Sequence, residues 1–318
     1  MSAELIIQNG NTIYYPTVLD GINWSTERYG SPGKLTFKCI YDESLVIEEG
    51  NPVRFRWNDQ NVFYGFIFSM SRDKEPILSI TAYDQLRYFK NKDTYVIEGE
   101  RADEKLKEII ADFKLNAGDI DNTKYVIPSL VEDNKSLFDI MQDCLDQTLT
   151  NTGEMYVLHD DFGKLSLQST SSLIKDTLID ADTGQNFDFS SSIDENTYNI
   201  IKLVYDNEKS GKRDVYMTKD SANINKWGVL QFYDKLQDGE NGQAKVEALI
   251  KLYNKKTRSL KVSKAIGDVS VKAGCLIPVI LDLGLAKVQS LMLVESCKHS
   301  FNENEDFMDL TLRGGGVV

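Results

Sequence analysis

Short runs in which apolar and polar residues alternate occupy both ends of the chain, and they constrain the fold more than any other feature. Residues 53–57 alternate in this way, and residues 62–68 form a second β-rich run after a polar four-residue loop. Two such runs about a short polar loop predict a β-hairpin. Gly65, inside the second run, indicates a bulge or a close backbone approach. The strand spacing favours a small barrel or sandwich over residues 1–95.

The period changes near residue 100, where apolar residues begin to recur at helical spacing. One apolar stripe predicts a helix that ends at residues 116–118, and a second predicts a helix that ends at Thr152 and Gly153, with Asn134 or Ser136 as its N-cap. Strand-like runs follow, so residues 96–185 are expected to form an α+β domain. The stripes consist of Ala102, Leu106, Ile109, Ile110 and Phe113, and of Leu137, Met141, Cys144 and Leu145.

Residues 186–318 return to short β-rich runs, with one helix expected near residues 243–256. The predicted class is therefore α+β and mainly β, with two small barrel domains (residues 1–95 and 186–318) separated by a helical insert (residues 96–185). No exact internal repeat is visible in the sequence. The N-terminus lacks the basic start and long apolar run of a signal peptide, and no stretch is apolar enough for a membrane helix.

Charge is distributed unevenly along a chain whose net charge is −13. Residues 93–161 hold 17 acidic against 6 basic side chains, whereas residues 209–264 hold 13 basic against 6 acidic. The basic stretch lacks the interleaved aromatic pattern of a nucleic-acid groove, so a docking surface for another protein or a solvated face is expected. The predicted contact residues lie in two loops: Asn58, Asp59, Gln60 and Asn61 in the first, and Lys209, Lys212 and Arg213 in the second.

No motif for catalysis, nucleotide binding or metal binding is present, so we expect no enzyme activity, cofactor or metal. His159 precedes two aspartates, but adjacent residues in a turn point in different directions and predict a surface turn. His299 is expected at an exposed or edge position. The four scattered cysteines are expected to be buried free thiols, in a protein made in a reducing cytoplasm.

The most informative single segment runs from Leu78 to Asn91, where an alternating strand leads directly into Tyr83-Asp84-Gln85-Leu86. Together with residues 62–67, the acidic helical stretch and residues 267–279, it resembles the tail-hub (baseplate-hub) proteins of contractile phage tails. The likeness covers nearly the whole chain and is greatest to the hubs of PBSX-type prophages and tailocin particles.

The resemblance implies a homotrimer in which each chain supplies two similar barrels. The resulting pseudo-sixfold ring would join the hexameric tail tube to the trimeric puncturing spike. Its expected partners are the tail tube protein, the spike protein, the tape-measure protein, the baseplate wedge proteins and further copies of itself. No specific nucleic-acid binding is expected, and an acidic lining of the bore would repel phosphate.

Two other functions stay open from the sequence. One is a cell-wall hydrolase or peptidoglycan-binding module of the tail tip, housed in the helical insert. The other is a carbohydrate-binding β protein, for which Trp24, Trp57 and Trp227 would be sugar platforms. Trp57 is in phase with Phe55 on one strand, so a core position is expected for it.

Overall fold

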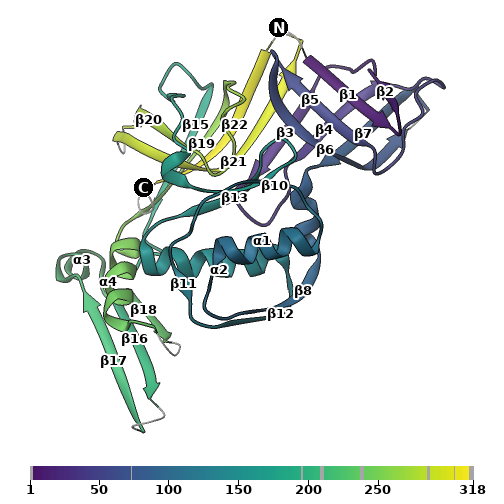
Figure 1. Ribbon diagram of the computed structural model, residues 1–318. Coiled ribbons are helices and arrows are strands. Elements are labelled where there is room, and N and C mark those ends of the chain that lie inside the picture. The colour runs from purple at the N-terminus through teal and green to yellow at the C-terminus, as the bar shows by residue number, and fades with distance from the viewer. Residues whose placement is uncertain are drawn as a thin grey trace.

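A continuous 12-stranded sheet runs through the computed structural model, which describes residues 3–72, 74–194, 196–207, 211–236, 240–284, 287–303 and 305–314 (Figure 1). Its strands come from the two ends of the chain. They are β1 (Ala3–Asn9), β2 (Thr12–Tyr14), β3 (Ile22–Glu27), β4 (Lys34–Ile40), β5 (Pro52–Trp57), β6 (Gln60–Arg72), β7 (Ile77–Tyr83), β15 (Asn186–Ser192), β19 (Thr257–Ile266), β20 (Leu276–Asp282), β21 (Lys287–Asn302) and β22 (Glu305–Gly314).

The strand order of this sheet contains the same five-stranded arrangement twice. The first module has the order β3-β4-β7-β6-β5, and the second has β15-β19-β22-β21-β20. Every pairing within both modules is antiparallel. Taken in chain order, the first strand of one module corresponds to the first strand of the other, and so on to the fifth. The chain is therefore a topological duplication.

The two modules also share irregular details. In each, the long fourth strand changes partners at one residue and then bulges: Phe66 in β6 pairs with both β5 and β7, and Leu293 in β21 pairs with both β20 and β22. The register shift follows directly, between Ile67 and Ser69 in one and between Val294 and Ser296 in the other.

A matching turn precedes the third strand of each module. Gly50 (φ 90°) donates its amide to the carbonyl of Ile67 at 2.8 Å, and Gly274 (φ 92°) donates to that of Val294 at 2.8 Å. These left-handed φ values favour glycine at both positions. A shared topology with a shared bulge and a shared turn supports a common structural origin for the two modules.

The modules are joined edge to edge, which corrects the expectation of two separate barrels. Residues 296–301 of β21 pair with residues 22–27 of β3. The described strands form an open path between β15 and β2, and neither module closes on itself. His299 is buried at this junction, stacked on Trp24 with ring centroids 5.1 Å apart, so its expected exposed position is wrong. His299 follows Lys298 on an alternating strand, and this local pattern does not predict that its ring packs against other aromatic rings.

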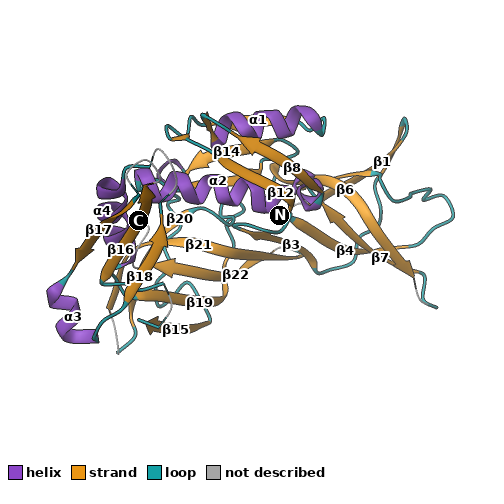
Figure 2. Cartoon of the chain, turned by 90° about the horizontal axis from the view of Figure 1, so that it is seen from below, coloured by secondary structure: helices purple, strands orange, loops and turns teal. Residues whose placement is uncertain are grey.

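The middle domain packs below the two modules in Figure 1 and along one side of the sheet in Figure 2. Its core gathers the predicted apolar stripes of α1 and α2. Ser136 caps α2, as one of the two predicted caps, and Gly153 (φ 75°) ends it. The domain boundaries at residues 95 and 185 stay a prediction. The elements are β8 (Lys92–Ile97), β9 (Glu100–Arg101), α1 (Ala102–Asp112), β10 (Ala117–Ile120), β11 (Val126–Ile127), β12 (Leu130–Ser136), α2 (Leu137–Thr152), β13 (Tyr156–Asp160) and β14 (Leu165–Ser169), with 3-10 helices η1 (Gln85–Lys90) and η2 (Thr170–Ser172).

A separate small unit interrupts the second module between its first two strands. It has its own apolar core and a three-stranded sheet. The sequence predicts a pair of strands at residues 198–205 and 214–218 and the longer helix of this unit, but not a core distinct from that of the second module. Among the described residues, no helix is both long and apolar enough to span a membrane. The elements of this unit are β16 (Ile200–Asn207), β17 (Lys212–Lys219), α3 (Ser221–Trp227), β18 (Gln231–Lys235) and α4 (Gly242–Tyr253).

We predict that Gly65→Ala destabilises the protein, because a Cβ atom at this position would lie 2.2 Å from the backbone oxygen of Tyr83. Backbone cannot move aside as a side chain can, so the unfolding free energy should fall by about 1–3 kcal/mol or more. Urea unfolding measures the change. Gly314→Ala is the matched control, since its nearest neighbour is the flexible end of Met292 at 3.3 Å. Equal stability of the two variants would contradict the prediction.

Candidate functional site

The segment that leaves β7 connects the first module to the middle domain, and Asp84 organises it. Asp84 is buried, and its carboxylate accepts hydrogen bonds from the amides of Gly33 (2.9 Å) and Leu86 (3.0 Å). The second of these bonds caps η1. A Cβ atom at residue 33 would lie 2.3 Å from the Asp84 carboxylate, so this contact requires glycine.

Gln85 extends the same junction into the middle domain. Its side-chain oxygen accepts a hydrogen bond from the amide of Asn116 at 2.8 Å, and its side-chain nitrogen donates to the carbonyl of Gly163. Gly163 itself lies against the ring of Tyr64 on β6, where a Cβ atom would be 2.5 Å from the ring. The polar pair Asp84-Gln85 therefore joins three segments that are distant in sequence.

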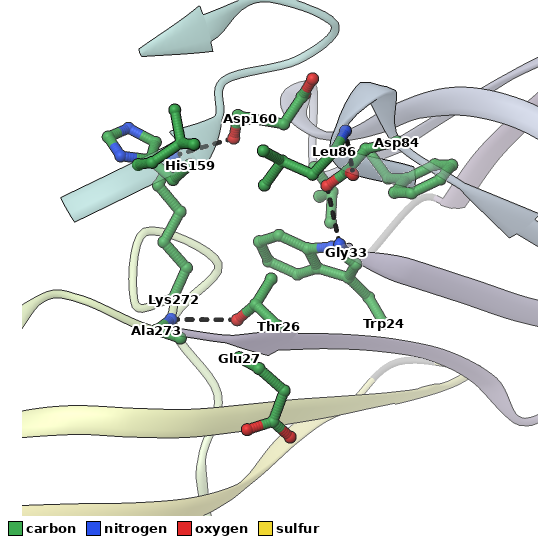
Figure 3. A pocket seen from close by; sticks show the side chains of 13 residues that line it. Trp24, Thr26, Glu27, Gly33, Asp84, Leu86, His159, Asp160, Lys272 and Ala273 are labelled. Atoms are coloured by element: carbon green, nitrogen blue, oxygen red, sulfur yellow. Dashed lines mark hydrogen bonds between the residues drawn. The ribbon is translucent and has the colours of Figure 1, made fainter. Parts of the chain in front are cut away.

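A small cavity lies beside this junction, between the first module, the middle domain and the turn before β20 (Figure 3). Its volume is about 20 Å³, which is room for one water molecule. The polar groups that line it include Asp84, His159, Asp160 and Lys272. His159 and Asp160 lie at the end of β13, where His159 is buried and Asp160 is half-buried, so the expected surface turn is wrong for His159.

Burial controls the protonation of the acidic groups. It raises the pKa of Asp160 to about 7, although a hydrogen bond from the amide of Gly163 and the charge of Lys272 oppose the shift. Burial, and then the charge of Asp160, also raise the pKa of Asp84 well above its usual value. The two carboxyl groups therefore disfavour each other's ionisation.

Burial acts in the opposite direction on His159, because it disfavours a charged imidazole. Together with the nearby Lys272, it lowers the pKa of His159 to about 3, so the ring is neutral near pH 7. Within the described part of the chain, Nδ1 of His159 and Oδ2 of Asp160 are buried without a hydrogen-bond partner. Lys272 compensates part of the acidic charge: its ammonium donates to the Asp160 carbonyl at 3.3 Å and pairs with Asp161 at 3.5 Å.

The geometry of this cavity suits a structural junction better than a catalytic centre. A glycosidase needs two carboxyl groups that flank a sugar linkage, and a sugar ring does not fit in 20 Å³. No cluster of three or more potential metal ligands occurs in the ranges that the structure describes. Trp24 and Trp57 are buried in the first core and offer no sugar platform, whereas Trp227 is half-buried on α3.

The predicted contact residues fall on two hairpins that do not come together. Asn58, Asp59, Gln60 and Asn61 form the exposed tip between β5 and β6, beside the N-terminal strand, because Trp57 pairs with Ala3. Lys212 and Arg213 begin β17 at the far end of the molecule in Figure 1, where Arg213 pairs with Asp206 at 2.5 Å. Lys209 lies outside the described residues. Both hairpins stay candidate contact surfaces.

The sequence signalled part of the junction. The polar pair after β7 stood out because it is bracketed by large apolar residues. Gly33 and Lys272 gave no signal, since one follows a proline in an ordinary turn and the other is one lysine among many. Contacts between segments so distant in sequence cannot be read from local patterns.

Comparison with known proteins gives consistent matches over almost the whole chain. The sequence model of the YQBQ-like family matches residues 22–313. The uncharacterized protein YqbQ of Bacillus subtilis (strain 168) is 32% identical over 311 residues, which cover 94% of this chain and 93% of the relative. The phage-like element PBSX protein XkdQ of the same strain is 29% identical over 312 residues, or 94% of each chain. The match to XkdQ confirms the predicted likeness to PBSX-type proteins.

Solved structures share the fold at low identity. The tail protein from Neisseria meningitidis MC58 has a TM-score of 0.69 at 13% identity and covers 100% of this chain and 98% of its own. The 43 kDa tail protein of prophage MuSo2 from Shewanella oneidensis has a TM-score of 0.67 at 12% identity, with coverage of 97% and 98%. The E. coli c3393 protein, a component of the type VI secretion system, has a TM-score of 0.58 at 9% identity, with coverage of 99% and 77%.

We predict that Asp160→Asn changes the pH dependence of stability. Folding raises the pKa of this carboxyl from 3.8 to about 7, so its favourable contribution is complete below pH 4 and is lost as pH rises toward 7. Asparagine cannot titrate. The unfolding free energy of the variant minus that of the wild type should therefore increase between pH 4 and pH 7, on the order of a few kcal/mol.

Chemical denaturation at several pH values measures this difference. Gly314→Ala is the control, because this substitution adds and removes no ionisable group and its nearest neighbour is the flexible end of Met292. For that variant the difference should stay flat across the same range. A flat difference for Asp160→Asn as well would show that the carboxyl of Asp160 ionises normally in the folded protein.

Proposed function

Because this chain belongs to the YQBQ-like family, we propose that it is the structural hub of a contractile phage tail or a phage-tail-like particle. In this role three copies form a pseudo-sixfold ring that joins the hexameric tail tube to the trimeric spike. The observation that carries the proposal is the duplicated five-stranded module of the sheet.

A ring that joins threefold and sixfold partners has to present different symmetries on its two faces. A chain with two copies of one module can do so, because three chains then offer six similar contacts on one face and three on the other. The fourth strand of each module bulges at the same position, and a glycine turn precedes the third strand of each. The two modules therefore share the backbone features that a common interface needs. The middle domain and the unit inserted in the second module occur once per chain, and so supply threefold features.

The relatives support a tail role in general terms. Their names place them in a phage-like element and in prophage tails, and the c3393 protein is described as similar to the T4 tail proteins gp27 and gp5. We infer incorporation of this chain into a phage or phage-like particle and a structural, non-enzymatic role. Its partners would be the tail tube, spike, tape-measure and baseplate wedge proteins, with an acidic bore that repels DNA.

We predict that a host carrying the corresponding prophage, with this gene deleted, makes no tails in which the tube ends in a spike. Without an adaptor, the tube and the spike share no matching contact surface. Electron microscopy of induced particles reads the result, and complementation with the intact gene should restore the spiked tails. Complete spiked tails in the deletion strain would refute the hub role.

The alternative wall-degrading role has its own test. Zymography on cell walls should show no clearing by the purified chain, since the buried carboxyl cavity holds no sugar. Clearing that disappears in the Asp160→Asn, Asp161→Asn double variant would assign hydrolase activity to the middle domain instead.

A further inference from the structure

We propose that neighbouring chains join by strand addition, in which β15 of one chain pairs with the free edge of β6 of the next. This inference rests on the proposed ring and specifies the contact that closes it. The partner is a second copy of the same chain, and the register follows from a junction already present within each chain.

The internal template is the junction of β3 and β21. One edge of β21 carries two strands in succession: β20 pairs with residues 287–293, and β3 pairs with residues 296–301. The other edge carries β22. The first strand of the first module thus adds to the fourth strand of the second module, just beyond the bulge.

Among the residues that the structure describes, no strand occupies the corresponding position in the first module. β6 carries β5 on residues 60–66 and β7 on the opposite edge, and its segment from Ser69 to Arg72 corresponds to residues 296–299 of β21. Within the described ranges, this segment pairs with β7 alone. Such an edge presents a row of backbone donors and acceptors to any strand that can approach it.

The strand that corresponds to β3 in the second module is β15, and it is an end strand of the sheet. The two strands match residue by residue: Ile22 and Trp24 on β3 occupy the positions of Phe187 and Phe189 on β15, because Trp24 pairs with Leu35 as Phe189 pairs with Leu260. Ile22 and Trp24 are 5% and 6% exposed, whereas both phenylalanines are only half-buried. A neighbouring strand would bury them in the same way.

The template gives the register of the contact. Lys298 pairs with Ser25 within the chain, so Ser71 of one chain should pair with Ser190 of the next. The hydroxyl of Thr26 also accepts a hydrogen bond from the amide of Ala273 at 2.9 Å. The corresponding contact between chains would join the hydroxyl of Ser191 and the amide of Glu49.

Within the described residues, β15 and β6 of one chain do not pair with each other. Six strands lie between them, which is roughly 34 Å measured along the sheet at about 4.8 Å a step. Each chain therefore offers one free β6 edge and one free β15 edge. A contact between unlike surfaces generates a ring if its rotation closes.

Disulfide trapping in the full-length chain tests this register. The Ser71→Cys, Ser190→Cys double variant should oxidise to a covalent trimer on a non-reducing gel, since a directly opposed pair brings its Cβ atoms within disulfide range. The matched control is Ser71→Cys with Asp188→Cys, a diagonal pair on the same face, which should give at least about tenfold less covalent trimer in the same thiol–disulfide buffer. The four native cysteines are buried and contribute little background.

Sedimentation of the same samples separates this proposal from the hub proposal. A trimer that forms without preferential trapping of the opposed pair would overturn strand addition and leave the hub role in place. A chain that stays monomeric at every concentration and is trapped by neither pair would overturn both. A ladder of open oligomers would support the strand pairing and contradict a closed ring of three.

Discussion

The pairing of β3 with β21 is the contact on which the rest of the structure depends. Backbone donors and acceptors on a strand edge have to be satisfied, and here the beginning of the chain satisfies the edge near its end. Trp24, His299 and Phe301 then fill the space over this junction, with centroids of 5.1 Å for the first two rings and 5.7 Å for the last two. Two modules that would each present an open edge thereby become one sheet, and the middle domain is held beneath it.

A second constraint is the cost of burying charge where three parts of the chain meet. Asp84 and Gln85 have their polar atoms satisfied largely by backbone groups of other segments, which makes their contacts specific in direction. Asp160 and His159 are less well satisfied, and burial shifts the pKa of each toward its neutral form. A junction of this kind orients the middle domain relative to the first module more firmly than apolar packing alone would, because hydrogen bonds require particular partners.

The duplication links the fold to its proposed role. The two modules have diverged so far that their sequences show no exact repeat, yet they retain the strand order, the bulge and the glycine turn. These features concern the backbone, and many side-chain combinations can satisfy them. A ring that depends on backbone edges can therefore tolerate sequence divergence that would destroy an interface of interlocking side chains.

Local patterns in the sequence determined the local elements: the stripe of α1, the Ser136 cap of α2, and the close approach at Gly65, where the Tyr83 carbonyl leaves no room for a side chain. Periodicity and turn residues act over a few residues, so they can be read without the fold. The union of two expected barrels into one sheet and the burial of His159 and His299 were decided only by the tertiary structure. Both arise where segments distant in sequence meet: β21 with β3 for the joined sheet and His299, and the cavity lined by Trp24 and Lys272 for His159. The identity of a residue says little about which strand edge or cavity it will meet.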